Sequence, residues 1–389
     1  MNKTYCPVPF REAMLVPGNA IILCCRHPDN HYIKNSFKET FTNDKITHIR
    51  KLMIAGTPVK GCEQCYREED QGVKSMRQMK IDRYGVVENI ELRSITIQFD
   101  NICNLKCRMC ASSQSHLLYE EEKILLEKTV SWQKFINTDR YSEIDTSNLE
   151  EIFIHGGEPF LSKKADTFFK TLIEKKHVEH LSISLNTNGT VTPPKYFLQA
   201  LLLCKKLSLN VSIDAHGELN DYFRSKSKFE TVIKNLDYFY SYFNQQRPNK
   251  ETNIGVNVTV NFYNVNKLNE LTTFLNSRYD GIMIKISFLH NPDFLRISTL
   301  PKEYKNIIRH SVKQFPEVLQ MLDKDDVDLF DEFVFFHNTL NELRGEDFDN
   351  LNPELSDYMK THQQKKYITP NHLSKYYQTV TIQEIKDNQ

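Results

Sequence analysis

The sequence predicts an α/β fold built on a partial barrel of six parallel strands. Three observations support this prediction: six short apolar stretches resemble strands, helical stretches separate most of them, and unusual polar residues follow the strands. Strands that alternate with helices at this spacing form right-handed βαβ units around a parallel sheet or barrel. Because six strands are too few to close an eight-stranded barrel, we expect a partial (β/α)6 barrel.

The strands are expected where β-branched and other apolar residues dominate a short run. These runs are Leu92–Phe99, Leu149–His155, Leu181–Asn186, Leu207–Ile213, Ile254–Asn261 and Met283–Phe288. Apolar residues at helical spacing mark the segments between the later strands. These helices are expected at Ala165–Lys175, Lys195–Lys206, Phe229–Phe243 and Leu268–Ser277.

The chain divides into three predicted parts. We expect a small cysteine-bearing domain at residues 1–90 and the barrel at residues 91–295. A more charged, mostly helical extension is expected at residues 296–389. Outside the barrel we expect the following elements: a turn at Pro17-Gly18-Asn19, a strand at Ala20–Cys24, and helices at Thr47–Ala55, Lys302–Phe315 and Asp328–Leu343. The end of the chain, from Gln364, is polar and is expected to be poorly ordered.

Composition and charge argue against some classes of function. Lys plus Arg number 50 and Asp plus Glu number 50, so the formal net charge is zero and no nucleic-acid partner is indicated. The apolar runs are too short to span a bilayer and the first residues contain no apolar signal core, so we expect a cytoplasmic protein with no membrane partner. Thiols stay reduced in the cytoplasm, which makes the nine cysteines candidate metal ligands or core residues.

The cysteines fall into groups with different chemistry. Cys103, Cys107 and Cys110 form a C-x3-C-x2-C, which offers three thiolates in one short loop. A cubane held by three cysteines leaves one iron open to a substrate or cofactor, as open catalytic zinc sites do. Cys62 and Cys65 form a C-x2-C, and two such arms hold zinc or a cubane. A zinc knuckle is the alternative for the three-cysteine loop, and Cys204 is expected in the core.

The polar motifs follow successive predicted strands. The three-cysteine loop follows the first strand, Gly156-Gly157-Glu158-Pro159 the second, Thr187-Asn188-Gly189 the third and Asp214-Ala215-His216 the fourth. The carboxyl ends of parallel strands meet at one edge, where such folds carry their functional loops. We therefore expect these motifs to gather at one rim of the barrel.

With these residues in view, the sequence resembles the radical S-adenosylmethionine (SAM) superfamily. The resemblance rests on Cys103-Asn-Leu-Lys-Cys107-Arg-Met-Cys110, on Gly156-Gly157-Glu158, and on Ser212-Ile-Asp214 with the downstream Asn220-Asp-Tyr-Phe-Arg224. It implies a [4Fe-4S] cluster on Cys103, Cys107 and Cys110 that binds SAM through its open iron and cleaves it to a 5′-deoxyadenosyl radical. The usual glycine after the Asp is Ala215 here, so the local backbone is expected to differ slightly.

The resemblance also assigns roles to cofactor-binding residues. Gly156 and Gly157 let the backbone approach the cofactor, and Glu158 accepts a hydrogen bond from the methionine amine. Asn188, Ser212 and Asp214 are expected near the ribose, and Arg224 is expected to pair with the methionine carboxylate. His155 and His290 lie near strand ends, and for each a structural role is the stronger expectation.

The N-terminal part is similar to the twitch/SPASM class of auxiliary-cluster modules. The pattern reads Cys6, Gly18, Cys24, then Cys62-Glu-Gln-Cys65, and a subgroup with this module in front of the barrel is matched by Cys65-Tyr66-Arg-Glu-Glu69 and Ser75-Met-Arg77. This implies a second, auxiliary [4Fe-4S] cluster on Cys6, Cys24, Cys62 and Cys65, with Cys25 as a competing ligand. Electron transfer that makes the net reaction oxidative is the expected role, and a purely structural cluster is the alternative.

These expectations combine into one leading function. We expect a radical SAM oxidoreductase that removes hydrogen from a peptide, a protein side chain or a small metabolite, with a flavodoxin or ferredoxin as reductant and no nucleic-acid partner. The alternatives are a non-catalytic zinc or iron–sulfur scaffold and an electron carrier. A scaffold explains the cysteines but not the glycines, Glu158 and Asp214 at the same rim.

Overall fold

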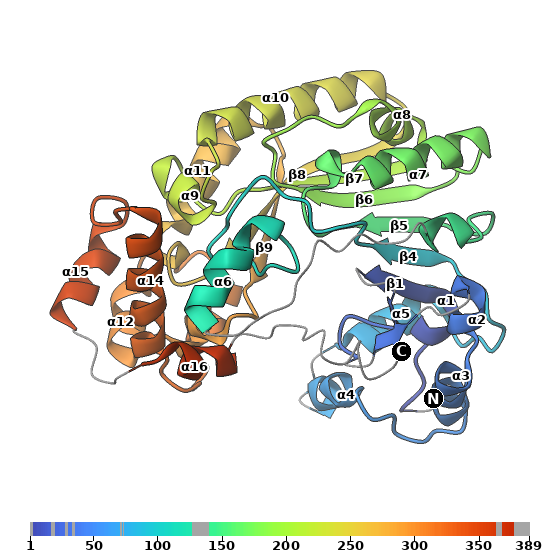
Figure 1. The fold of residues 1–389 in the computed structure, drawn as a ribbon, viewed down its shortest axis with the longest axis horizontal. Helices are drawn as coiled ribbons and strands as arrows, with labels where there is room; N and C mark the ends of the chain where they lie inside the picture. Colours follow the sequence, from blue (N-terminus) through green and yellow to red (C-terminus); the bar gives the residue numbers. More distant parts are fainter. Residues whose placement is uncertain are drawn as a thin grey trace.

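The computed structural model describes residues 3–16, 20–27, 30–32, 36–70, 72, 74–126, 140–362 and 368–376. Within these residues the strands form one sheet with the order β3-β2-β1-β4-β5-β6-β7-β8-β9 (Figure 1). Neighbouring strands from β4 to β9 are all parallel. They are β4 (Ser94–Ile97), β5 (Glu151–Ile154), β6 (Ser182–Thr187), β7 (Lys206–Ser212), β8 (Glu251–Val260) and β9 (Met283–Phe288). The predicted α/β fold with a parallel sheet is confirmed, and the partial barrel is consistent with it.

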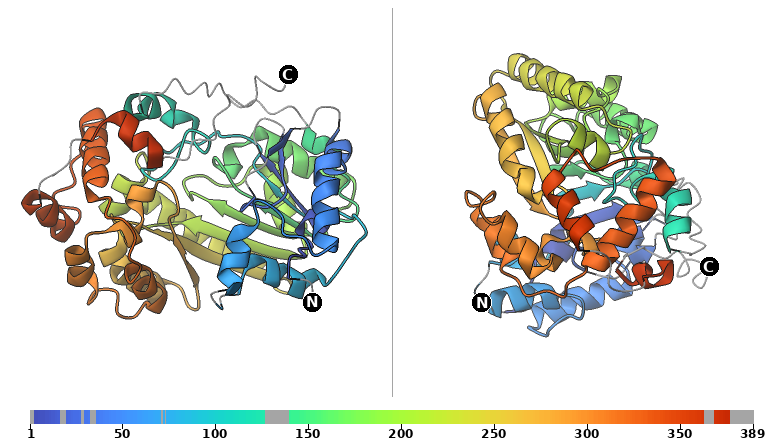
Figure 2. Two further views of the ribbon diagram at one scale, coloured as in Figure 1. Left: turned by 90° about the horizontal axis from the view of Figure 1, so that it is seen from below. Right: turned by 90° about the vertical axis from the view of Figure 1, so that its left-hand side faces the viewer.

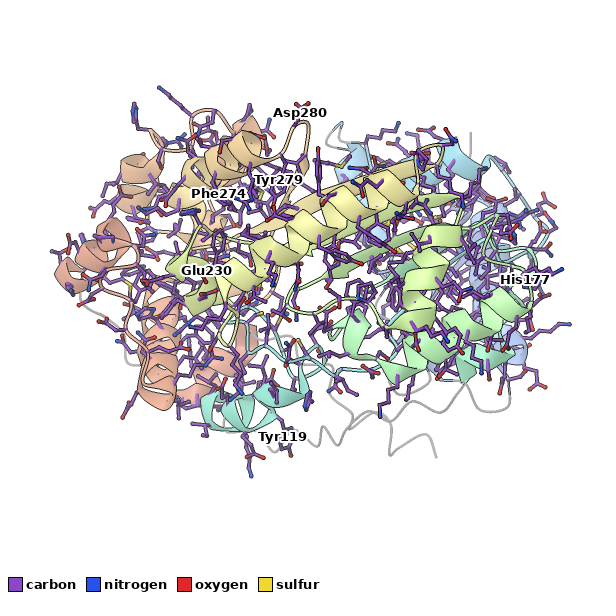
Figure 3. The ribbon with its side chains drawn as sticks, turned by 90° about the horizontal axis from the view of Figure 1, so that it is seen from above. Tyr119, His177, Glu230, Phe274, Tyr279 and Asp280 are labelled. Atoms are coloured by element: carbon purple, nitrogen blue, oxygen red, sulfur yellow. The ribbon has the colours of Figure 1, made fainter. Side chains whose placement is uncertain are left out.

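Helices cover one face of this sheet (Figure 1). They are α7 (Lys163–Glu174), α8 (Lys195–Leu203), α10 (Phe229–Gln246) and α11 (Leu268–Arg278), close to the predicted bounds. Figure 3 looks onto this layer, with Glu230 on α10 and Phe274 on α11 near one another and His177 towards the opposite end. The rings of Tyr240 and Tyr279, 5.3 Å apart, join α10 to the end of α11.

The alternation along β7 shows how the sequence separates the two faces of the sheet. Leu207, Leu209 and Val211 are fully buried, whereas Ser208, Asn210 and Ser212 are half-buried. Successive side chains of a strand point to opposite faces, so the apolar row packs in the core and the polar row lines the other face. β6 repeats the pattern with buried Ile183 and Leu185. The polar face therefore belongs to the interior of the partial barrel.

The N-terminal part joins the same sheet. β1 (Glu12–Val16) pairs in parallel with β4, from Glu12 opposite Ser94 to Leu15 opposite Ile97. β2 (Ala20–Ile22) and β3 (Asn30–Tyr32) continue the sheet in antiparallel fashion. The sequence analysis did not predict β1 or β3. The predicted boundary at residue 90 therefore does not interrupt the sheet.

Short helices surround these N-terminal strands (Figure 1). They are α1 (Val8–Arg11), α2 (Phe37–Phe41), α3 (Asp44–Ile54), α4 (Glu63–Asp70) and α5 (Met76–Tyr84). The helix predicted at Thr47–Ala55 corresponds to α3, and the strand predicted at Ala20–Cys24 overlaps β2. The predicted turn at Pro17-Gly18-Asn19 lies outside the described residues.

The C-terminal extension is helical, as expected, and lies at the opposite end of the molecule from the N-terminal helices (Figures 1 and 2). Its helices are α12 (Lys302–Ile308), α13 (Pro316–Leu322), α14 (Phe330–Arg344), α15 (Pro353–Thr361) and α16 (Pro370–Leu373). The predicted helix over Lys302–Phe315 was too long, because α12 already ends at Ile308. Most of the predicted polar end beyond Gln364 lies outside the described residues.

Two further helices complete the connections around the barrel. They are α6 (Tyr119–Leu126), which contacts α14, and α9 (Glu218–Phe223), which follows β7. Single 3-10 turns occur at His116–Leu118, Arg140–Glu143, Pro159–Leu161, Val265–Lys267, Asp293–Leu295, Ile297–Thr299 and Ser374–Tyr376. Among the described helices, none combines the length and apolar character that a membrane crossing requires.

Candidate functional site

The loop with the three cysteines, residues 103–110, follows β4 and contacts residues at the end of β6 and at the end of α9. The Asn188 Nδ2, just after β6, is 3.8 Å from the Cys103 Sγ. The Arg224 Nη1, at the end of α9, is 3.9 Å from the Cys107 Sγ. A hydrogen bond from the Cys110 thiol lowers the pKa of Cys107 and raises that of Cys110. The structure therefore brings Asn188, which was expected at this rim, and also Arg224 to the cysteine loop.

The two glycines of the Gly-Gly-Glu motif bring the loop after β5 against the cysteine loop. The Glu158 N–H donates to the Ile102 carbonyl, 2.7 Å away. Gly157 has φ of 56°, and a Cβ there would lie 2.5 Å from the same carbonyl oxygen. A Cβ on Gly156, where φ is 80°, would lie 2.4 Å from the Gln98 side chain. The positive φ favours glycine at both positions, and at Gly157 a side chain would also push the two loops apart.

Glu158 connects the ends of β5 and β6. Its carboxylate accepts hydrogen bonds from the Asn188 N–H at 2.7 Å, the Thr187 hydroxyl at 2.7 Å and the Phe160 N–H at 3.2 Å. The side chain is buried, and burial raises its pKa to about 7. A carboxylate has about four acceptor positions, so protein donors already occupy most of them. The structure thus gives Glu158 a positioning contact with Asn188.

Both the nitrogen and the oxygen of the Asn188 side-chain amide form hydrogen bonds. Its Nδ2 donates to the Asn104 Oδ1 at 2.9 Å, and its Oδ1 accepts from the Thr190 N–H at 2.9 Å. Asn104 belongs to the cysteine loop, next to Cys103. The sequence analysis expected Asn188 near the ribose of a cofactor, and the structure adds that its amide fixes the start of the cysteine loop.

A buried ion pair lies behind Cys107. The Arg224 Nη2 is 2.8 Å from the Asp214 Oδ2, and the Thr259 N–H donates to the Asp214 Oδ1 at 2.7 Å. Both charged side chains are buried, and burial raises the pKa of Asp214. The Asn220 Oδ1 accepts from the Asp214 N–H at 3.0 Å. The guanidinium therefore lies between the carboxylate and the Cys107 thiol.

Two buried donors at this site have no hydrogen-bond partner in the part of the chain that the structure describes. They are the Nε of Arg224 and the Nδ2 of Asn220. An unsatisfied buried donor is costly, so such groups often await a ligand. The remaining predicted residue, Ser212, lies at the end of β7 on the half-buried face, opposite Asn257 of β8.

A buried arginine in the cysteine loop contacts the C-terminal extension. Arg108 is 1% exposed, and its guanidinium carbon lies 3.8 Å from the centre of the Tyr222 ring. Its Nη2 donates to the Asn341 Oδ1 at 2.7 Å and to the Glu346 Oε2 at 2.5 Å. The sequence analysis missed this role, since the partners lie 233 and 238 positions further along the chain.

A second set of charges supports the same loop from α6 and α14. The Lys106 Nζ donates to the Glu121 Oε1 at 2.9 Å, and the Arg344 Nη2 donates to the Glu121 Oε2 at 2.6 Å. Glu121 and Arg344 are both largely buried. The only local signal for these contacts was the pair of cations, Lys106 and Arg108, on either side of Cys107. The C-terminal extension thus holds the cysteine loop through two sets of buried ion pairs.

The four predicted N-terminal cysteines line one cavity, which we call the N-terminal cavity. It has about 520 Å³ of space that no atom fills, including its opening to solvent, and its lining includes Cys6, Cys24, Cys62 and Cys65. Cys25 is exposed and is absent from this lining. Burial raises the pKa of Cys6 and that of Cys62 to about 12. Of the two competing cysteines, Cys24 is thus the one that faces the other three.

The residues singled out after Cys65, Glu69 with Ser75 and Arg77, make a set of largely buried contacts beside this cavity. The Glu69 Oε1 accepts from the Ser75 hydroxyl at 2.5 Å and from the Arg77 Nε at 2.8 Å. The Arg77 Nη1 donates to the Tyr5 carbonyl at 2.8 Å. Tyr5 precedes Cys6 in the chain, and Glu69 lies on the same helix as Cys65. These contacts hold together the segments that carry the cysteines.

No three of the described His, Cys, Asp and Glu side chains converge closely enough to hold one metal ion. A four-iron cubane takes each thiolate at a different iron, so its ligands surround a space instead of meeting at a point. The arrangement around the N-terminal cavity has this character.

The two candidate histidines differ. The His155 Nε2 is buried and has no hydrogen-bond partner among the described residues, and burial lowers the pKa of His155 to about 4. The His290 carbonyl accepts from the Arg296 Nε at 2.6 Å. The pKa of His290 is lowered by burial and then by the charges of Arg296, Lys324 and Arg26. Burial therefore disfavours the charged form of both rings.

Comparison with known proteins places a family on the central part of the chain. Residues 97–263 match the model described as the Radical SAM superfamily. It contains the three-cysteine loop, the Gly-Gly-Glu motif, Asp214 and Arg224. The matched segment therefore includes all the predicted residues of the barrel-rim site.

Individual relatives are distant. An uncharacterized protein of Archaeoglobus fulgidus is 26% identical over 216 residues, which is 55% of this chain and 44% of the relative. The chain thus covers less than half the length of this curated relative. Among solved structures, anSMEcpe with bound AdoMet and the Cp18Cys peptide is 19% identical, with 65% of this chain and 66% of that chain covered at a TM-score of 0.37. Streptococcus suis SuiB bound to its precursor peptide SuiA is 14% identical, with 76% and 67% covered at a TM-score of 0.38.

Proposed function

We propose that this protein is a radical SAM enzyme. The observation that carries the proposal is the arrangement of Cys103, Cys107 and Cys110 against buried Asn188 and Arg224, inside the segment that matches the superfamily. When bound there, a [4Fe-4S] cluster supplies the electron that cleaves SAM to a 5′-deoxyadenosyl radical, which then removes hydrogen from a substrate. The three thiolates hold this group and leave room for one more ligand.

The donor set around the loop suits SAM. The buried Arg224 Nε and Asn220 Nδ2 still need acceptors, and SAM brings a carboxylate, ribose hydroxyls and ring nitrogens. A guanidinium fork is suited to the methionine carboxylate, and Asp214 keeps that fork in place. Ser212 and Asn188 remain candidates for the ribose. Glu158 acts by fixing Asn188, and the fourth acceptor position of its carboxylate is left for the methionine amine.

We further propose an auxiliary [4Fe-4S] cluster held by Cys6, Cys24, Cys62 and Cys65. Support comes from the single cavity that these side chains line and from the exclusion of Cys25 from it. Four protein thiolates complete the coordination, so this group is suited to electron transfer and not to substrate binding. The net reaction is then oxidative.

The proposed substrate is a peptide, a protein side chain or a small metabolite, and the proposed electron donor is a flavodoxin or ferredoxin. The half-buried face of the sheet offers hydroxyl and amide groups from Ser184, Asn186, Ser208 and Asn210 to such a substrate. Hydroxyl and amide groups both donate and accept hydrogen bonds, which suits peptide bonds and sugar hydroxyls alike.

Release of 5′-deoxyadenosine tests the proposed activity. Protein reconstituted anaerobically with iron and sulfide is incubated with SAM and dithionite, and the product is measured by liquid chromatography. The wild-type chain and Cys204→Ala are expected to release it, since Cys204 lies in the core. Cys107→Ala is expected to release none. Equal release by Cys107→Ala and the wild type would refute the assignment of the radical site.

A matched pair of variants tests the choice between the adjacent cysteines. Cys24→Ala is expected to lower the bound iron by about four atoms per chain, whereas Cys25→Ala is expected to keep it. The reverse result would show that Cys25 is the ligand.

A further inference from the structure

Arg26 contacts two of the four cysteines of the N-terminal cavity. Its backbone N–H lies 3.4 Å from the Cys24 Sγ, and its Nη1 lies 3.6 Å from the Cys65 Sγ. Arg26 also lines the cavity itself. One residue thus directs both an amide and a permanent positive charge at the sulfur atoms that surround this space.

The guanidinium is held in that position by Glu68. The Arg26 Nη1 is 2.5 Å from the Glu68 Oε2, and each side chain is 24% exposed. Glu68 lies on α4, one turn after Cys65, so the anion that orients Arg26 comes from the same helix as a cysteine. Because the pair is mostly shielded from water, its field is screened less than that of a surface charge.

Arg26 is also close to the barrel. Its charge is one of three that lower the pKa of His290, after burial, together with those of Arg296 and Lys324. His290 follows β9 at the carboxyl edge of the sheet. The charge of Arg26 is thus felt at the residue that follows β9, as well as at the N-terminal cavity.

We infer that Arg26 raises the reduction potential of the auxiliary cluster and so favours electron flow from the barrel towards it. This inference rests on the proposed auxiliary cluster. The physical reason is that adding an electron makes an iron–sulfur centre more negative, so a nearby cation and N–H···S contacts stabilise the reduced form. Arg26 thus acts through the cluster and does not contact the substrate.

The chain offers matched variants for the test. Arg26→Gln removes the charge, and Arg26→Lys keeps it. Arg67→Gln removes an equal charge from the exposed side of α4, where the structure gives no contact between Arg67 and a cysteine thiol among the described residues. All three are made in the full-length chain with Cys103, Cys107 and Cys110 changed to Ala, so that only the auxiliary cluster contributes a signal.

The measurement is a potentiometric titration followed by electron paramagnetic resonance. At the midpoint potential of the parent protein, Arg26→Gln is expected to reduce the ratio of reduced to oxidised cluster by about tenfold, which is 59 mV for a one-electron couple. Arg26→Lys and Arg67→Gln are expected to stay within about twofold of the parent ratio. When the same substitutions are made in the wild-type protein, the auxiliary cluster is recognised by the resonance signal that does not change when SAM is added. We expect the three variants to rank in the same order by the reduced fraction of that cluster.

Three negative results have different meanings. A bound iron content near zero in the triple-Ala parent would refute the auxiliary cluster and the inference with it. A content of about four irons per chain, with an unchanged midpoint potential in Arg26→Gln, would refute the role of Arg26 and leave the cluster standing. A shift in Arg67→Gln as large as that in Arg26→Gln would also refute it, because the effect would then be one of net charge.

Discussion

The two cysteine sites are built in opposite ways. At the barrel rim, Cys103, Cys107 and Cys110 come from one loop, and the contacts that fix this loop come from distant parts of the chain. Around the N-terminal cavity, the cysteines come from three separate segments, and the contacts that join them come from nearby residues such as Glu69 and Arg77. At the barrel rim, cysteines that are close in sequence are thus held by residues that are distant in sequence. Around the N-terminal cavity, cysteines that are distant in sequence are held by residues that are close to one of them. We therefore expect that each site can be disrupted without disturbing the other.

The largest expected effect comes from the remote support of the barrel-rim loop. Arg108→Met leaves Glu346 and Asn341 without their buried partner and removes the contact with the Tyr222 ring. We expect the free energy of unfolding to fall by about 3 kcal/mol, and the iron of the radical site to be lost while the auxiliary iron remains. Urea denaturation and iron analysis of the reconstituted protein measure these two quantities.

A surface ion pair of the same extension serves as the control. Arg309 and Asp323 are paired but well exposed, so Arg309→Gln is expected to change stability by less than about 1 kcal/mol and to leave all the iron bound. If Arg108→Met lost iron from both sites equally, the independence of the two sites would be wrong.

The next effect concerns the local support of the N-terminal cavity. Glu69→Gln weakens the contacts with Ser75 and Arg77, and so loosens the link between α4 and the segment that carries Cys6. We expect a loss of about 2 kcal/mol in stability and the selective loss of auxiliary iron. Release of 5′-deoxyadenosine is the readout that should persist, since the barrel-rim site keeps its own contacts.

The exposed pair of Lys74 and Asp82 on the same side of the molecule gives the control for this variant. Asp82→Asn is expected to leave both stability and iron content within experimental error of the wild type. Retention of all the auxiliary iron by Glu69→Gln would show that these contacts do not support the cavity.

A third effect is a pH dependence of stability at the barrel rim. Burial raises the pKa of Glu158 from 4.5 to about 7, so the folded protein holds this proton where the unfolded chain has released it. Stability from this group is therefore complete below pH 4.5 and declines as the pH rises towards 7, by up to about 3 kcal/mol. Glu158→Gln does not titrate. The stability difference between the wild type and Glu158→Gln, measured in urea, should thus favour the wild type more at pH 5 than at pH 8. A constant difference would contradict the buried, titrating carboxyl.

The sequence predicted the parallel sheet well because its strands carry local patterns. β4 to β9 alternate or cluster apolar residues, and all six were expected close to their observed bounds. β1 was missed because its five residues lie between prolines and its partner, β4, is about 80 positions away. The helix predicted after Lys302 was too long: α12 ends at Ile308, and a separate helix begins at Pro316.

The candidate site also combines features that a local sequence pattern predicts with contacts that it does not predict. Cys103, Gly156 and Arg224 were found by local motifs, and the structure brings their segments together. The sequence could not reveal that Gly157 makes room for the Ile102 carbonyl, or that Glu158 already binds the Asn188 N–H. It also gave no sign of the contact between Arg108 and Glu346, because an ion pair between distant residues leaves no periodic trace.

The iron content of reconstituted protein tests the central claim of two independent cluster sites most directly. We predict about eight irons per chain in the wild type. We predict about four when Cys103, Cys107 and Cys110 are Ala, and about four when Cys6, Cys62 and Cys65 are Ala. A wild-type content of about four, reduced to zero by the first set of substitutions and unchanged by the second, would contradict the account.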